Sequence, residues 1–200
     1  AIIIEEAQAL GVQPGLGVRM RLASIGAGKW QNSGGDKAKF GLSPRQVLDL
    51  VEKLKAANML DALQLLHFHM GSQISNVRDI ANGMREAVRY FIELSKMGCA
   101  IRYMDSGGGL GVDYEGTRSR GYCSINYGLD QFAHTLVQPL AEACNEFKLA
   151  PPMMITEAGR AMTAHHAVMV VNVSEVEPAP EGSVPATRPG APAVLRHPRE

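Results

Sequence analysis

Residues 101–116 read IRYMDSGGGLGVDYEG, a candidate strand end followed by a cluster of glycines. A short apolar run over 101–106 gives way at once to three consecutive glycines, as at the end of a buried strand. Only glycine lets several successive backbone N–H groups approach an anion closely, so a phosphate is a natural ligand here. A tight turn that serves only the fold would use the same residues, and the glycines taken alone favour this simpler interpretation.

Along the rest of the chain, short apolar runs alternate with longer amphipathic ones, which is the pattern of repeated βα units around a parallel sheet. Strands are predicted over 17–24, 63–70, 101–106, 152–156 and 167–176. Helices are predicted over 44–57, 76–97 and 126–147, the first of them beginning at an N-cap serine followed by proline. The sequence therefore predicts an α/β fold in which each helix returns the chain to a new parallel strand.

The composition describes a globular protein with 46% hydrophobic residues and equal numbers, 20 each, of basic and acidic side chains. This balance argues against nucleic acid or an anionic membrane as a partner, and no apolar stretch approaches the roughly 20 residues that a membrane span needs. The three cysteines are widely spaced and suit a reducing cytoplasm. After residue 177 the chain becomes rich in proline, glycine and alanine, which predicts a linker or surface insertion over 178–200.

Two histidines end the second predicted strand, in the sequence HFHMGSQ. His67 and His69 alternate along the strand and so point to the same side. They could be hydrogen-bonded core residues, metal ligands, or, for one of them, a flat ring stacked on an aromatic cofactor. Ser72 just beyond offers a hydroxyl group to a phosphate, and the pair alone does not decide among these possibilities.

The fourth predicted strand ends in TEAGRAM, which places a carboxylate next to an apolar run. Such a group is costly to bury unless a cation or a hydrogen-bond donor meets it. A local ion pair between Glu157 and Arg160 is the simplest explanation. The functional alternative has Glu157 facing a protonated ring nitrogen, with the backbone at Gly159 and Arg160 holding a phosphate.

Taken together and in this order, the motifs HxGS, GGG and EAGR resemble those of the fold-type III pyridoxal-phosphate decarboxylases, which act on ornithine, diaminopimelate or arginine. The longer strings GVRMRLAS, GKWQNSGGDKAKFGL, LQLLHFHMGSQ, DSGGGLGVDYEGTRS, NYGL and TEAGRAMTAHHAV are most similar to the bacterial arginine-specific members. The resemblance covers nearly all of residues 1–177. It implies a (β/α)8 TIM-type barrel of the alanine-racemase-like kind, present here in part, without the first barrel strands and the C-terminal β domain.

The resemblance also implies roles for individual residues around pyridoxal 5'-phosphate. It assigns His69 to stacking on the pyridine ring and Glu157 to pairing with the ring nitrogen, which makes these two the candidate catalytic residues. It assigns phosphate binding to Gly107, Gly108, Gly109, Gly159 and Arg160, and gives Ser72 a hydrogen bond to the phosphate or the hydroxyl of the cofactor. It assigns substrate binding to Met104, Asp105, Ser106, Gly107, Gly108, Gly109, Leu110, Gly111, Val112, Asp113 and Tyr114. Magnesium is implied by the resemblance only, with no residue to hold it.

The implied reaction is the decarboxylation of L-arginine to agmatine and carbon dioxide in putrescine and spermidine biosynthesis, by a cytoplasmic homo-oligomer. A carboxylate at Glu157 would keep the ring nitrogen protonated. The resemblance implies that racemases of this fold have an arginine at the same place, so Glu157 favours a decarboxylase. Asp113 and Glu115 are candidates for attracting the guanidinium of arginine. They could equally be solvent-facing residues of the loop without a role in binding. The family's cofactor-bonding lysine has no counterpart in this chain, which we therefore expect to be inactive by itself.

Other functions remain open at this point. A diaminopimelate- or ornithine-type decarboxylase would share the fold, and a non-catalytic barrel that carries pyridoxal phosphate would share the cofactor site. The long GKWQNSGG and GVDYEGTRS segments argue against such a carrier. A metal-dependent hydrolase could use His67, His69, His165 and His166 with a carboxylate, but it would leave the glycine cluster without a role.

Overall fold

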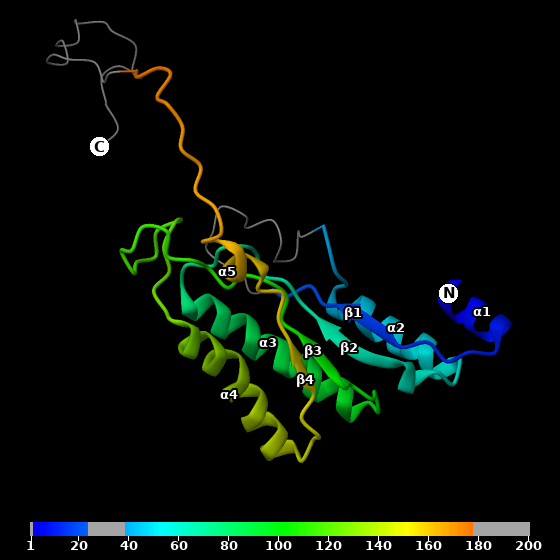
Figure 1. Ribbon diagram of the computed structural model, residues 1–200. Helices are drawn as coiled ribbons and strands as arrows, with labels where there is room; N and C mark the ends of the chain where they lie inside the picture. Colours follow the sequence, from blue (N-terminus) through cyan, green and yellow to red (C-terminus); the bar gives the residue numbers. More distant parts are fainter. Residues whose placement is uncertain (1, 24–38, 178–200) are drawn as a thin grey trace, which may run out of the picture. The chain divides into compact units, whose positions relative to one another are not determined.

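Four short parallel strands form one sheet in the order β1-β2-β3-β4 (Figure 1). They are β1 (Leu16–Arg19), β2 (Leu63–His67), β3 (Tyr103–Asp105) and β4 (Met153–Ile155). The structure is a computed structural model that describes residues 2–23 and 39–177. The predicted α/β class is confirmed, since strands that follow one another in the chain are neighbours in the sheet and a helix lies between them.

Helices α2 (Pro44–Ala56), α3 (Val77–Lys96) and α4 (Leu129–Phe147) connect the successive strands, and α3 packs against α4 (Figure 1). The structure also contains α1 (Ile2–Leu10), the short 3-10 helix η2 (Leu60–Ala62) and α5 (Gly159–Thr163). The predicted start of α2 is confirmed: Ser43 and Gln46 form a reciprocal capping box, with proline at the first helical position. Asn76, predicted as the first residue of the second helix, is the N-cap of α3 and accepts the Arg78 N–H.

The predicted start of the third helix, at Asn126, is wrong by three residues. Asn126 and Tyr127 instead anchor the loop that follows β2: the Asn126 N–H donates to Ser75 O at 2.9 Å and the Tyr127 hydroxyl donates to Ile74 O at 2.7 Å. Helix α4 therefore begins after Gly128, which has no side chain to cap it. Apolar periodicity alone could not distinguish these anchoring residues from a first helical turn.

The two faces of the sheet differ in character, as expected from the alternation of side chains along a strand. Val18, Leu66 and Met104 are in register on β1, β2 and β3 and are buried in the core. The next row holds Arg19, His67 and Asp105, again in register. One step along the strands thus changes an apolar row into a row of ionisable side chains, at the carboxyl ends where ligands bind in parallel sheets.

The strand predicted over 167–176 is wrong. The residues from Ala167 to Glu177 form no strand, and the valines are exposed, Val170 to 89%. A β-strand is held by hydrogen bonds to a neighbour, so a valine-rich composition alone does not form one. The chain divides into a compact unit over Ala1–His166 and a second unit over Ala167–Glu200. The predicted linker over 178–200 and most of the GKWQNSGGDKAKFGL motif lie outside the described residues.

Candidate functional site

The loops after β2, β3 and β4 meet at the carboxyl edge of the sheet. The Gly108 N–H donates to His69 Nδ1 at 3.2 Å, which joins the first loop to the second. The Glu157 N–H donates to Gly107 O at 2.9 Å, which joins the second loop to the third. Segments that are widely separated in sequence therefore form one cluster, as the prediction from the three motifs requires.

His69 is a neutral, partly buried imidazole in this cluster. Burial lowers its pKa below the ordinary value of 6.5, and the neighbouring positive charge of Arg19 lowers it further, while Glu157 acts in the opposite sense. Because the Gly108 N–H donates to Nδ1, that nitrogen is an acceptor and the ring proton lies on Nε2. A neutral ring of fixed orientation suits stacking against an aromatic ligand.

The three glycines after β3 are required by their surroundings. Gly107 has a φ of +66°, and a Cβ there would collide with the carbonyl oxygen of Phe68. A Cβ on Gly108 would lie 3.1 Å from Glu157 O and 3.3 Å from His69 Cε1. Gly109 has a φ of +117°, which side chains rarely adopt. The close approach of backbone to backbone leaves this loop without side chains where a phosphate would bind.

Arg160, in α5 after β4, links this loop to the loop that follows β2. Its guanidinium donates to Ser72 Oγ at 3.0 Å and to the Tyr114 hydroxyl at 3.3 Å. The local ion pair between Glu157 and Arg160, the simplest explanation from sequence, is not among the ion pairs in the described part of the chain. A hydroxyl and a guanidinium thus converge from separate loops, a combination that suits a phosphate.

His67 forms a partly buried pair with Asp105, with 2.9 Å between Nδ1 and Oδ2. The other carboxylate oxygen of Asp105 accepts the N–H of Gly107 at 2.9 Å. A ring nitrogen of His67 and carboxylate oxygens of Asp105 and Glu157 all lie within 4.8 Å of one another. Among residues 2–23 and 39–177 this is the one group that could hold a metal ion, and it includes none of the other histidines proposed for a metal-dependent hydrolase.

The segment predicted to bind substrate, residues 104–114, is mixed in its accessibility. Met104 and Ser106 are buried, whereas Tyr114 is half exposed. Asp113 accepts hydrogen bonds from Ser124 Oγ at 2.7 Å and from the Arg118 N–H at 3.1 Å. The Ser124 bond holds the pKa of Asp113 below its usual value. The accessible end of the segment is therefore the part able to meet a ligand, and Asp113 already organises its own loop.

Two residues that fix these loops were missed by the site prediction. Gln73 forms a double hydrogen bond with the backbone of Val112, at 2.6 Å and 2.9 Å. The buried Tyr127 hydroxyl accepts the Gly111 N–H at 3.1 Å and donates to Ile74 O. Burial raises the pKa of Tyr127, so its hydroxyl stays protonated as this bond requires. The only signal was their presence in the quoted strings LQLLHFHMGSQ and NYGL.

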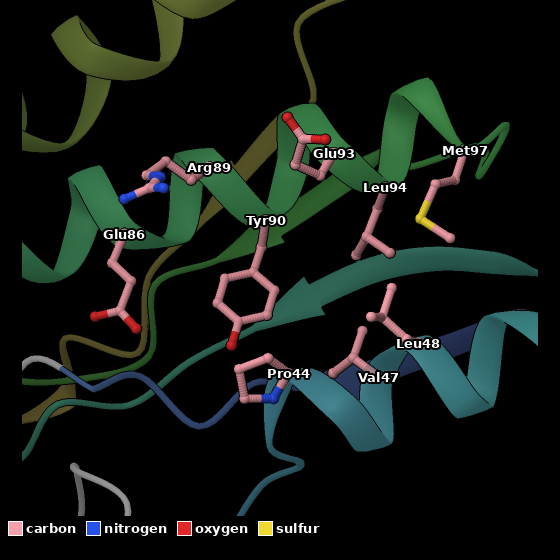
Figure 2. A pocket seen from close by; sticks show the side chains of 9 residues that line it. All are labelled: Pro44, Val47, Leu48, Glu86, Arg89, Tyr90, Glu93, Leu94 and Met97. Atoms are coloured by element: carbon pink, nitrogen blue, oxygen red, sulfur yellow. The ribbon is translucent and has the colours of Figure 1, made fainter.

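A separate groove lies on the helical layer, between α2 and α3 (Figure 2). Its floor is apolar, with Val47, Leu48, Leu94 and Met97, and Glu86, Arg89 and Glu93 come from α3 (Figure 2). It contains neither the glycine loop nor the two histidines of β2. The chemistry-bearing residues are therefore gathered at the strand ends and not in this groove.

A family comparison agrees with this geometry. Residues 3–164 match the model of the pyridoxal-dependent decarboxylases, pyridoxal binding domain. The chain belongs to this family. The matched range includes β1 to β4 and all of the strand-end cluster, and the family implies pyridoxal phosphate as the cofactor.

Curated family members are closely similar over the whole chain. The biosynthetic arginine decarboxylase of Xanthomonas campestris pv. campestris is 70% identical over 199 residues, which is 100% of this chain and 32% of that protein. That of Neisseria meningitidis serogroup B is 56% identical over 194 residues, 97% of this chain and 31% of that protein. The chain thus spans about a third of the length of the relatives it matches.

Solved structures of the family share the fold. The biosynthetic arginine decarboxylase of Campylobacter jejuni is 30% identical with a TM-score of 0.66, covering 79% of this chain and 25% of that one. The diaminopimelate decarboxylase of Helicobacter pylori, in complex with L-lysine, is 23% identical with a TM-score of 0.58, covering 78% and 36%. The parallel sheet described above is consistent with part of a barrel. Within the described residues, no helix is long and apolar enough to cross a membrane.

Proposed function

We propose that this chain supplies the pyridoxal-phosphate site of an enzyme that decarboxylates L-arginine to agmatine and carbon dioxide, on a route to putrescine and spermidine. The observation that carries the proposal is that His69, Gly108 and Glu157 come together from three strand ends. The Gly108 N–H donates to His69, and the Glu157 N–H donates to the Gly107 carbonyl. The identity of 70% to a biosynthetic arginine decarboxylase supports arginine as the substrate.

The residues fit the cofactor's three chemical demands. Arg160 and Ser72 would bind the phosphate together with the side-chain-free backbone of Gly107, Gly108 and Gly109. His69, neutral and oriented by Gly108, would pack against the ring face. Glu157, with no ion pair in the described residues, would accept a hydrogen bond from the ring nitrogen.

Pyridoxal phosphate, when bound, supplies a ring that withdraws the electrons left on the α-carbon as carbon dioxide departs. The protein's part is to keep the ring nitrogen protonated, and the Glu157 carboxylate does this by favouring the cationic form. His69 excludes water from one face of the ring. The accessible end of the 104–114 segment, at Tyr114, is where the chain would meet the substrate.

Three further parts of the proposal come from the family resemblance alone. They are a magnesium requirement, assembly of the full-length protein into a homo-oligomer, and a cytoplasmic location. The metal-capable group of His67, Asp105 and Glu157 does not suit magnesium, because that ion prefers an octahedron of oxygen ligands and water. We therefore assign no residue of this chain to magnesium.

The test is the full-length protein that contains these residues, incubated with pyridoxal phosphate and with arginine, ornithine, diaminopimelate or lysine in turn. We expect a bound-cofactor absorbance band and release of agmatine and carbon dioxide from arginine only. A matched variant, Glu157→Gln, should keep the band and lose most turnover. Turnover of diaminopimelate or ornithine would show that the protein acts on the substrate of another branch of the family. Cofactor binding without any turnover would indicate a non-catalytic carrier of pyridoxal phosphate.

A further inference from the structure

The proposed function leaves the His67–Asp105 pair without a role, although these two ionisable side chains are largely enclosed by the protein. The two side chains are 17% and 13% exposed, and His67 Nδ1 lies 2.9 Å from Asp105 Oδ2. His67 and Asp105 face each other in register at the ends of β2 and β3. The pair is held by the sheet itself, so its geometry costs little side-chain entropy compared with an exposed ion pair.

The pair continues into the backbone that carries Glu157. Asp105 Oδ1 accepts the Gly107 N–H at 2.9 Å, and the Gly107 carbonyl in turn accepts the Glu157 N–H at 2.9 Å. An unbroken series of hydrogen bonds therefore runs from a side chain on β2 to Glu157, two residues after the end of β4. Gly107 has the left-handed φ of +66°, which this series helps to hold.

The pair also affects how two neighbouring carboxylates, those of Asp105 and Glu157, are oriented. Oxygens of Asp105 and Glu157 lie within 4.8 Å of each other and of a His67 ring nitrogen. Like charges at this separation repel, and the more so away from bulk water. With Asp105 bonded to His67 and to Gly107, its carboxylate is turned into the protein and the Glu157 carboxylate is left for a ligand.

We propose that His67 is a positioning residue for Glu157, acting through Asp105 and Gly107. The inference rests on the proposed function, in which Glu157 accepts a hydrogen bond from the ring nitrogen of the cofactor. A divalent metal held by the same three side chains is disfavoured, because His67 Nδ1 and both oxygens of Asp105 are already engaged in hydrogen bonds within the protein.

The experiment compares His67→Leu with His67→Asn in the full-length protein. Leucine removes the N–H donor, whereas the asparagine amide nitrogen lies close to the position of Nδ1 and can donate to Asp105. Two quantities are measured: the dissociation constant of pyridoxal phosphate, and the resonance of a 15N label at its ring nitrogen. We expect His67→Leu to weaken binding by about tenfold, the scale of one lost charge-assisted hydrogen bond, and to shift the 15N resonance. His67→Asn should recover both.

The control is His134→Leu, an exposed histidine on α4, which should match the wild type in both measurements. If His67→Leu is insoluble, Asp105→Asn takes its place and should shift the 15N resonance as well. Wild-type protein that does not bind the cofactor would overturn the proposed function itself. Wild-type binding with an unaltered 15N resonance in the His67 and Asp105 variants would overturn only this inference. A stoichiometric divalent metal in cofactor-free protein, lost in His67→Asn, would overturn it in favour of a metal site.

Discussion

The guanidinium of Arg160 donates a hydrogen bond to Ser72 Oγ at 3.0 Å, across 88 positions of the chain. The loops after β2 and β4 are not neighbours through their strands, because β3 lies between them. The bond therefore spans the glycine loop that follows β3. A hydroxyl and a cation held on either side of a glycine loop without side chains are an arrangement that suits an anion.

Removing either side chain should weaken pyridoxal phosphate binding in the full-length protein. We expect Arg160→Gln to cost about 1.5–3 kcal/mol, the scale of a hydrogen bond to a charged group, which is roughly ten- to a hundredfold in the dissociation constant. Ser72→Ala should act in the same direction and more weakly. The measurement is a cofactor titration followed by absorbance. Arg45→Gln, an exposed change on α2, is the control, and equal affinities for all three variants would contradict the phosphate assignment.

A methyl group at Gly108 should disturb both the cofactor site and the packing of the loop. Its Cβ would lie 3.1 Å from a backbone oxygen and 3.3 Å from the His69 ring, so the ring must move by a few tenths of an ångström. We expect Gly108→Ala to lower cofactor affinity by about tenfold, while overpacking costs about 1–3 kcal/mol of stability. Gly15→Ala, whose Cβ would have its nearest neighbour at 3.9 Å, is the matched control. Equal cofactor affinity in the two variants would show that Gly108 serves only the turn.

The lowered pKa of His69 gives the cofactor-free protein a specific pH dependence. Below the ordinary value of 6.5, the unfolded chain binds a proton at this residue more readily than the folded chain does. The contribution to stability is therefore complete above 6.5 and is lost as the pH falls toward the lower folded pKa. Urea denaturation between about pH 7 and pH 5 should show a smaller loss of stability in His69→Gln than in the wild type. His134→Gln should keep the wild-type slope; equal slopes in all three proteins would refute the assignment.

Removing the hydroxyl of Tyr127 should loosen both the loop after β2 and the loop after β3. Tyr127→Phe leaves the Gly111 N–H and the Ile74 carbonyl without their shared partner in a buried position. Each unsatisfied buried group costs about 1–3 kcal/mol, so the free energy of unfolding should fall by at least that amount. Tyr122→Phe, at a side chain that is 67% exposed, should leave it nearly unchanged. Hydrogen exchange at Gly111 should become faster in the first variant, and unaltered exchange would contradict the anchor.

Much of the fold could be predicted because its local signals agree with its tertiary structure. Ser43 with proline, and Asn76 before an amphipathic run, mark helix starts by short-range chemistry that folding does not override. The start of α4 and the supposed strand over 167–176 failed for the opposite reason. Asn126 is hydrogen-bonded to a loop that is distant in sequence, and the valines have no neighbouring strand to pair with. A short window of sequence contains neither kind of information.

The same distinction applies to the site. The motifs predicted that His69, Gly108 and Glu157 would come together, because parallel strands bring their carboxyl ends to one edge. They did not predict that Arg160 would bond Ser72 and Tyr114 in place of Glu157, since side-chain partners across loops depend on three-dimensional placement. The roles of His67 and Gln73 likewise became visible only through their hydrogen bonds.

The exposed valines after His166 have a practical consequence for anyone handling this polypeptide. Val168, Val170 and Val171 are 70–89% exposed, in a run with no charge from Ala167 to Val173. Extended segments of this kind, apolar and without charge or proline, readily recruit identical copies into intermolecular β-structure. Protein produced with these 200 residues should therefore be prone to self-association that starts at residues 167–173.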